Sequence, residues 1–284
     1  NNPYSREFGL ANMKLTPMIK RSLNFVTATI TSFVILGSIA NADTSWMEKV
    51  KPFTIGPHPK MKPTKLEYEL SWKGTVKAGT ITFDFNKKDK RYKGLDISQV
   101  YGRSQYLAYT VFPYHFSMTS FTKTSTHKPL IFVADEKDKR DKVKTTNTFK
   151  PDGVAHTSTK NHLIKKTTKN RDHFFKYPNS HDPISAIQYI RRQPLNDGDI
   201  IHLCLHPFNS AMFSEITVLG RDSHNGRACI KLDIKLQKID KATMHLKIYK
   251  KLKKATLWIS DDVDRIMVEL RTQVFIGDVR AVLK

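Results

Sequence analysis

The residues best suited to metal chemistry are two histidines and a cysteine spaced by two, His202, Cys204 and His206. On a β-strand these three side chains share one face. Neighbouring members would be about 6–7 Å apart at Cα, which suits a shared zinc or copper ion, but the two histidines would be about 13 Å apart. A metal site would therefore need a ligand from another strand, such as His224 or His245. The alternative, a polar strand face with ordinary histidines, is the favoured interpretation.

Cys204 and Cys229 are the only cysteines. In an oxidising compartment, a disulfide between them would close a loop of about 25 residues and restrict the unfolded chain by roughly 3 kcal/mol. The alternative is a pair of buried thiols too far apart to bond. The spacing alone does not choose between the two.

The acidic run with Asp261, Asp262 and Asp264 offers paired carboxylates, which bind Ca²⁺ or act as acid and base in catalysis. Asp261 and Asp262 are therefore the catalytic candidates. Their position between two alternating segments favours a tight turn instead, with the carboxylates bonding the local backbone. The chain has no glycine-rich phosphate loop and no G-x-S-x-G or H-E-x-x-H motif. The sequence thus favours binding over catalysis and predicts no cofactor.

The 284-residue chain is strongly basic, with 48 lysines and arginines against 26 acidic residues and a net charge of +22. A field of this sign favours anionic partners. Basic residues gather in four runs that the pattern places at hairpin ends. These runs are Lys87, Lys88, Lys90 and Arg91; Lys137, Lys139, Arg140 and Lys142; Lys165, Lys166 and Lys169; and Lys250, Lys251, Lys253 and Lys254. If the hairpins turn at one rim, the runs form a positive collar; scattered solvated lysines are the alternative. The candidate ligand-binding residues are the four lysines of the last run, from Lys250 to Lys254, together with Trp258 further along the chain.

The segment from Met13 to Ala42 predicts a cleavable signal peptide. It has a basic start, an apolar stretch over 25–39 and small residues at Ala40 and Ala42, so cleavage is expected after Ala42. The alternative is an uncleaved N-terminal membrane anchor, which the length disfavours because about 15 apolar residues are short for a bilayer about 30 Å thick. Residues 1–12 are treated as an upstream extension. Removing the leader's four basic residues and one acidic residue leaves +19. Periplasmic export excludes nucleic acid as a partner and favours anionic lipid, lipopolysaccharide or acidic glycan.

Most of the remaining chain alternates apolar and polar residues with a period of two, which is typical of strands with one buried face. The clearest series are Leu66, Tyr68, Leu70 and Trp72; Ile230, Leu232, Ile234 and Leu236; Met244, Leu246 and Ile248; Ala255, Leu257 and Ile259; and Ile266, Val268 and Leu270. A slip of one residue at Ala78-Gly79 predicts a β-bulge. Short turns between the series indicate antiparallel neighbours.

One segment has a helical pattern. Asp182 is a suitable N-cap, Pro183 suits the first turn, and isoleucines spaced by three continue to 190, so a helix is expected over 183–192. A weaker helical turn is expected around 104–110. Residues 43–63, with four prolines, predict an extended, non-helical linker. A single mainly β domain is expected over 64–284, built as a large curved antiparallel sheet, a half-barrel or a barrel, with one short helix inserted.

The predicted domain carries three motifs in order. They are Leu66-x-Tyr68-x-x-x-Trp72-x-Gly74-x-x-x-Ala78-Gly79; Asp182-Pro183-Ile184-Ser185-Ala186-Ile187-x-Tyr189-Ile190-Arg191; and Leu257-Trp258-Ile259-Ser260-Asp261-Asp262 with Arg265-Ile266. Together with the last strand, 277–283, they resemble the bacterial domain-of-unknown-function 3108 family. Met267 departs from that family's usual proline. The resemblance implies an exported, β-rich envelope protein of Gram-negative bacteria, with no settled activity and no established catalytic residues.

Three functions follow from these observations. The leading hypothesis is a non-enzymatic envelope protein that binds an anionic amphiphile or glycan, with the sheet holding the apolar part and lysines the charged group. The alternatives are an enzyme acting on envelope glycan through Asp261 or Asp262, and a basic scaffold for an acidic envelope protein.

Overall fold

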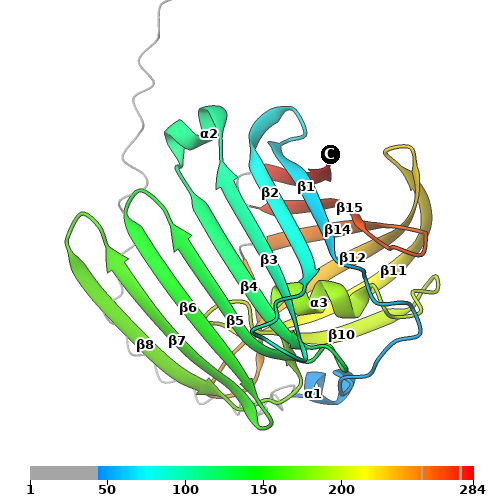
Figure 1. The fold of residues 1–284 in the computed structure, drawn as a ribbon, viewed down its shortest axis with the longest axis horizontal. Coiled ribbons are helices and arrows are strands. Elements are labelled where there is room, and N and C mark those ends of the chain that lie inside the picture. The colour runs from blue at the N-terminus through cyan, green and yellow to red at the C-terminus, as the bar shows by residue number, and fades with distance from the viewer. Residues whose placement is uncertain (1–43, 251, 275–276) are drawn as a thin grey trace, which may run out of the picture. The chain divides into compact units, whose positions relative to one another are not determined.

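The structure is a computed structural model that describes residues 44–250, 252–274 and 277–284. The predicted signal peptide and the upstream extension, residues 1–42, lie outside the described residues. The described strands form one sheet (Figure 1). They are β1 (Thr64–Trp72), β2 (Val76–Lys87), β3 (Leu95–Ser104), β4 (His115–Lys123), β5 (Pro129–Lys137), β6 (Asp141–Lys150), β7 (Gly153–His162), β8 (Thr167–Phe175), β9 (Ser180–His181), β10 (Ile200–Leu205), β11 (Met212–His224), β12 (Arg227–Ile239), β13 (Leu246–Ile248), β14 (Leu252–Ser260), β15 (Met267–Val274) and β16 (Gly277–Leu283). The helices are α1 (Trp46–Lys49), α2 (Tyr106–Val111) and α3 (Pro183–Ile190).

The sheet consists of two meanders that meet edge to edge. Strands β1 to β8 follow one another in order, and β16, β15, β14, β12, β11 and β10 continue from β1 on its other side. The junction is the antiparallel pair β1–β16, with Tyr68 opposite Leu283. All pairs are antiparallel except the short parallel pair β9–β10. The sheet curves strongly but stays open, with β8 and β9 as its edges, so the predicted curved sheet is confirmed.

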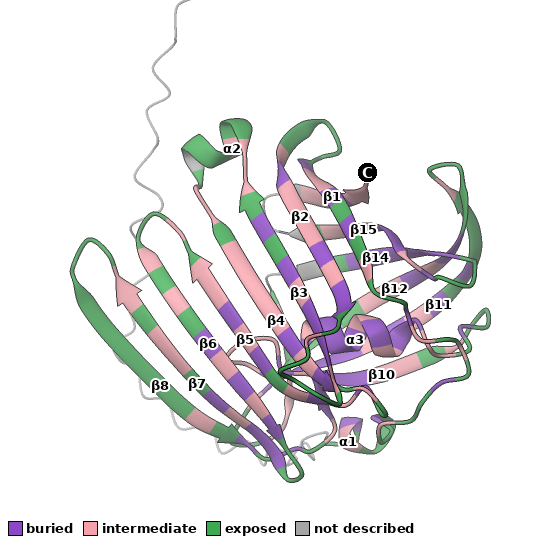
Figure 2. Ribbon diagram, in the orientation of Figure 1, coloured by how far each residue is buried: buried purple, intermediate pink, exposed green. Residues whose placement is uncertain are grey.

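The main core lies on the face of the sheet that also contacts α3. Alternate residues such as Tyr68, Phe83, Ile230 and Leu257 are buried on this face, as the period of two predicted. Figure 2 shows burial concentrated around α3 and in the nearby halves of the strands, whereas the far ends of β3 to β8 are mostly intermediate or exposed.

The predicted bulge in β2 is confirmed. Leu70 lies opposite Gly79 and Ser71 opposite Lys77, which leaves Ala78 as the extra residue. A Cβ atom on Gly79 would lie 2.2 Å from the carbonyl oxygen of Arg103, so the close approach of β3 requires glycine there.

The alternation predicted for β15 is wrong at Val268. Trp258 lies opposite Glu269 but Ile259 lies opposite Met267, so Val268 is an extra residue in the pairing. Met267 belongs to the main core, whereas Val268 packs with Cys229 and Trp258 in a separate small cluster. A bulge shifts the side-chain period by one residue, and no glycine marks this one in the sequence.

Helix α3 is confirmed, although it ends at Ile190 rather than 192. The side chain of Asp182 accepts hydrogen bonds from the backbone N–H groups of Ile184 (2.8 Å) and Ser185 (3.0 Å). It also accepts one from Ser120 on β4 (2.7 Å), so the cap fastens the helix to the sheet. The helical turn expected around 104–110 is confirmed as α2.

Replacing the cap of α3 is expected to destabilise the fold. Asp182→Ala removes the acceptor for two backbone donors and one hydroxyl at a fully buried position, so we expect a loss of about 2–3 kcal/mol in unfolding free energy. Asp182→Asn keeps an acceptor oxygen and should lose less. Urea unfolding of both variants at pH 7 measures the difference, and equal losses would contradict the capping role.

The segment expected to be a linker packs on the core instead. Trp46 of α1 is only 1% exposed, contacts the rings of Tyr177 and Phe213, and donates its indole N–H to the carbonyl oxygen of Met244 (2.8 Å). Further along the segment, the carbonyl oxygen of Pro59 accepts a hydrogen bond from the side chain of Arg191, which is buried at the end of α3 (3.1 Å). We call residues 44–63 the strap.

The basic runs do not share one rim, so the single positive collar does not form. Because the first meander alternates direction, its turns divide between two opposite rims of the sheet. The turns at 73–75, 105–114, 138–140 and 163–166 form the upper rim, at the top of Figure 1. The turns at 88–94, 124–128 and 151–152 form the lower rim. The run around Lys87 to Arg91 therefore lies opposite the runs around Lys137 to Lys142 and Lys165 to Lys169.

Candidate functional site

The three candidate metal ligands do not converge. His202 lies 3.4 Å from a carboxylate oxygen of Glu215 and stacks on Phe213, whereas Cys204 is buried beside the hydroxyl of Ser180. His206 lies after the end of β10 and packs against His156. The candidate third ligands lie elsewhere: the ring of His224 stacks on Trp258, and His245 follows β12 in the turn before β13. Within the described ranges, no three His, Cys, Asp or Glu side chains are grouped so that they could hold a metal.

The two cysteines are free, buried thiols, so the alternative to a disulfide holds. Cys204 lies opposite Phe213 on β11, and Cys229 lies opposite Asp222 on the same strand. These positions are separated by about 30 Å at roughly 3.3 Å per residue, far beyond the span of a disulfide. Burial raises the pKa of the Cys204 thiol to about 12, which makes it unreactive.

The catalytic candidates, Asp261 and Asp262, lie in the turn between β14 and β15, where their carboxylates make local contacts. One oxygen of Asp262 accepts from the Ser260 hydroxyl (2.8 Å) and from the backbone N–H groups of Asp264 and Arg265 (both 2.9 Å). Asp261 forms an ion pair with Arg221 at 3.3 Å. These contacts support the turn interpretation, since the carboxylates stabilise local backbone and a neighbouring cation.

Trp258, expected to bind ligand, is covered by other side chains and is only 5% exposed. The His224 ring stacks on it with centroids 4.2 Å apart, and the cationic groups of Lys231 and Arg271 lie 5.5 and 5.0 Å from its ring centre. The indole therefore packs between this ring and these cations on one side and Val268 and Cys229 in its own cluster, and it offers little free surface to a ligand.

The lysines of the last basic run border an apolar groove, which we call the lysine groove. It arises because β12 pairs with β14 up to Ile234 but with β13 from Gln237 onward, so the two partner strands diverge between these residues. The groove has a volume of about 520 Å³. Its apolar lining residues are Ile234, Leu236, Ile248 and Tyr249, and its polar ones are Lys235, Gln237, Lys250 and Lys254.

The lysine groove combines exposed apolar surface with positive charge. Ile248 is 81% exposed, an unusual state for a residue of this size. Lys235 lies 3.2 Å from a carboxylate oxygen of Glu215, so part of its charge is already balanced. Lys250 and Lys254 are exposed. Lys251 and the side chain of Lys253 lie outside the described part of the chain.

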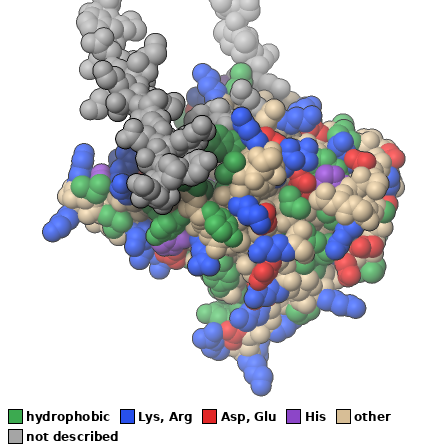
Figure 3. All heavy atoms as spheres, turned by 90° about the horizontal axis from the view of Figure 1, so that it is seen from above, with side chains coloured by type: hydrophobic (Ala, Val, Ile, Leu, Met, Phe, Trp, Pro, Cys, Tyr) green, Lys and Arg blue, Asp and Glu red, His purple; other side chains and the backbone are tan. Residues whose placement is uncertain are grey.

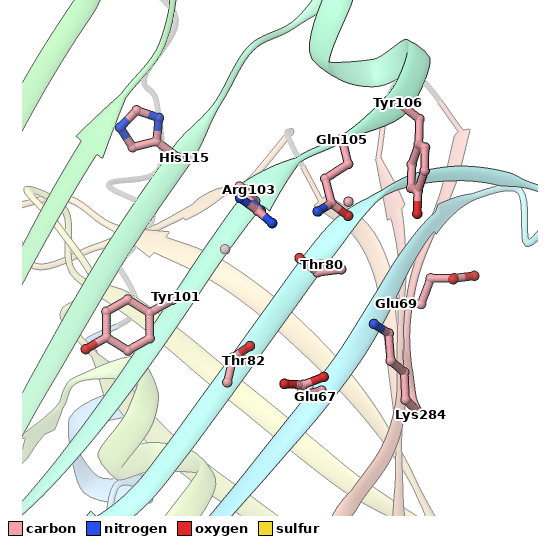
Figure 4. Close-up of a pocket in the computed structure, with 12 residues that line it drawn as sticks. Glu67, Glu69, Thr80, Thr82, Tyr101, Arg103, Gln105, Tyr106, His115 and Lys284 are labelled. Carbon is pink, nitrogen blue, oxygen red and sulfur yellow. The ribbon is translucent and has the colours of Figure 1, made fainter.

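A second groove, which sequence reasoning missed, lies on the outer face of β1, β2 and β3 and has a volume of about 540 Å³ (Figure 4). We call it the polar groove. Its labelled lining residues are Glu67, Glu69, Thr80, Thr82, Tyr101, Arg103, Gln105, Tyr106, His115 and Lys284. Figure 4 shows these side chains spread along the strands rather than aimed at one point. The sequence did contain a sign of this groove, because polar residues occupy alternate positions of the first two strands.

The polar groove carries both signs of charge. The carboxylates of Glu67 and Glu69 and the cations of Arg103 and Lys284 all line it, and Glu69 already forms an ion pair with Lys77 (2.8 Å). Such a surface suits a ligand with many hydroxyl groups better than an anion. The described helices include none that is long and apolar enough to cross a membrane.

A family model described as a protein of unknown function, DUF3108, matches residues 67–284. The chain belongs to this family. The match begins within β1 and runs to the end of the chain, so it contains both meanders and both grooves, and it confirms the resemblance of the three motifs. The family's description assigns no activity.

Solved structures support the fold. A β-barrel-like protein of the domain of unknown function DUF1849 from Brucella abortus is 9% identical, with a TM-score of 0.52, over 80% of this chain and 97% of that chain. The lipoprotein LppX from Mycobacterium tuberculosis is 10% identical over 77% of this chain and 85% of that chain, but its TM-score is 0.20, too low to support an argument. No curated protein matches this chain. At this identity the Brucella structure supports a β-barrel-like fold and nothing about ligand.

Proposed function

We propose that this protein is exported to the periplasm of a Gram-negative bacterium and binds an anionic amphiphile in the lysine groove. The observation that carries the proposal is the fork between β13 and β14. There an exposed apolar surface around Ile248 adjoins the side chains of Lys250 and Lys254. An acyl chain would cover the apolar lining, and the lysines would pair with a phosphate or carboxylate head group.

Two properties favour a small amphiphile over an acidic glycan at this groove. The lining is mainly apolar, which offers few hydrogen-bonding groups for sugar hydroxyls. The volume of about 520 Å³ is within the range of small-molecule sites, so the groove can hold one acyl chain, with the head group at the lysines. Phospholipids and the lipid part of lipopolysaccharide both have this chemistry.

The test is a binding measurement with lysophosphatidylglycerol below its micellar concentration, with zwitterionic lysophosphatidylcholine as the comparison ligand. Lys250→Glu/Lys254→Glu should weaken binding of the anionic ligand at least about tenfold, since reversing two charges changes the binding free energy by more than about 1.4 kcal/mol. Ile248→Asp should weaken both ligands, because it places a charge in the apolar lining.

The matched control is Lys87→Glu/Lys90→Glu, which makes the same change in net charge at exposed lysines of the lower rim. It should bind within about twofold of the wild type. Equal losses in the two double variants would overturn the assignment to the groove. Lysolipid binding that depends on Tyr101 or Arg103 instead would move the amphiphile site to the polar groove.

A further inference from the structure

The upper rim carries exposed large apolar side chains on two of its projecting turns. The residues are Tyr106, Leu107, Tyr109 and Phe112 in the turn that contains α2, and Leu163 and Ile164 in the turn between β7 and β8. Their exposed fractions run from 42% to 69%. Single exposed apolar residues are ordinary, but six on neighbouring turns form a patch that needs a partner.

These turns lie together in space. The backbone N–H of Leu163 donates to the carbonyl oxygen of Arg140 (2.7 Å), which joins the β7–β8 turn to the β5–β6 turn. A shallow depression of about 260 Å³ is lined by Tyr109, Lys137, Lys139 and Leu163 among others, so the turn containing α2 also adjoins them. We call this group of three turns the docking rim.

The docking rim is also basic. It carries Lys137, Lys139, Arg140, Lys165 and Lys166, and none of these five cations forms an ion pair with another described residue. The nearby carboxylate of Asp138 accepts from the backbone N–H groups of Arg140 and Asp141 (both 2.7 Å) and so serves the turn itself. Figure 3 views the molecule from above, with Lys and Arg side chains interspersed among hydrophobic ones on the visible face.

We propose that the docking rim binds the surface of an anionic lipid bilayer. Aromatic and aliphatic side chains on projecting turns would enter the interface, while the lysines around them would pair with lipid phosphates. The free cations favour an anionic surface over a neutral one. The apolar residues project from turn tips rather than lining a groove, which favours a flat, deformable partner over a shaped protein. This inference goes beyond the proposed function and uses no residue of the lysine groove.

The experiment is co-sedimentation of the full chain with vesicles of phosphatidylcholine, alone or with one quarter phosphatidylglycerol. We expect the wild type to partition at least about tenfold more strongly onto the anionic vesicles at low salt. Leu107→Ser/Phe112→Ser and Lys139→Glu/Lys165→Glu should each reduce that partition at least about fivefold. The apolar segment 25–39 is present in every variant, so it cannot produce a difference between them.

Two controls match these changes. Ile200→Ser/Leu219→Ser removes similarly exposed apolar side chains from β10 and β11, and Lys87→Glu/Lys90→Glu makes the same charge change on the lower rim. Both should bind within about twofold of the wild type, and circular dichroism should show every variant folded. If the apolar rim variant binds like the wild type, or if both charge variants lose binding equally, the proposal is overturned. Lys250→Glu/Lys254→Glu should keep vesicle binding, which separates this result from that of the lysine groove.

Discussion

Acidification from pH 7 to pH 4 is expected to destabilise this protein strongly, because several histidines are held neutral in the folded state. Three of them form a cluster: His156 on β7, His173 on β8 and His206 after β10, with ring centroids 4.5 to 6.1 Å apart. His156 bonds the side chains of Asn147 (2.7 Å) and Ser158 (3.1 Å). The two ring nitrogens of His206 are buried with no hydrogen-bond partner among the described residues.

The pKa values of these groups are lowered chiefly by burial. Burial, with the neighbouring histidine, lowers the pKa of His156 to about 4, and burial lowers that of His206 to about 3 and that of His173 below its usual value. Other charges face the cluster: Lys241 lowers the pKa of all three histidines, Arg171 lowers that of His156, and Asp172 raises that of His173. Outside the cluster, burial lowers the pKa of His181 to about 3 and that of His127 to about 4.

The direction of the pH effect follows from proton binding. Below about pH 6.5 the unfolded chain binds protons at these histidines and the folded chain does not, so acid favours unfolding. Each such group contributes up to about 1.4 kcal/mol per pH unit until its folded-state pKa is reached. The contribution of these histidines to the unfolding free energy is therefore fully present above about pH 6.5 and is lost as the pH falls toward 4. Several groups acting together would remove a large part of the usual total stability of about 5–15 kcal/mol.

Urea unfolding at pH 7, 6 and 5 measures this effect. His206→Phe should reduce the pH dependence of the unfolding free energy and raise stability at pH 5, because it replaces buried, unpaired nitrogens with an apolar ring beside Phe175. The control is His115→Phe at an exposed position of β4, which should leave the pH dependence unchanged. If His206→Phe unfolds with the same pH dependence as the wild type, the cluster is not the source.

The second large effect is expected from Trp46→Ala. This change should reduce the unfolding free energy by about 3–5 kcal/mol, because it empties a large buried site and leaves the Met244 carbonyl oxygen without its indole donor. It should also release the strap, so that protease cleaves within residues 44–63 before the rest of the chain. Thermal and urea unfolding with timed proteolysis measure both results.

The matched control for Trp46 is Ile55→Ala, a change in the same strap at a side chain that is 55% exposed. It should change the unfolding free energy by no more than about 0.5 kcal/mol. Trp46→Phe keeps most of the packing and should fall between the two. A small effect of Trp46→Ala would mean that the strap contributes little to the fold.

The sequence by itself determined the local structure of this protein. Alternation at Leu66 to Trp72 and at Ile230 to Leu236 identified strands, and the slip at Gly79 identified a bulge. Asp182 and Pro183 marked the start of α3. Each of these features depends on residues close together in the chain, where side-chain period, capping and backbone freedom decide the outcome. The three motifs also carried enough information to identify the family.

Only the tertiary structure decided which of these elements meet. It separated Cys204 from Cys229, covered Trp258 and placed the basic runs of the first meander on two rims. It also buried Trp46, which precedes the sheet, against Phe213 on a strand far along the chain. The lysine groove exists because β12 changes its partner from β14 to β13 between Ile234 and Gln237. Strand order and register depend on the summed packing and hydrogen bonding of segments distant in sequence, and no local pattern contains that sum.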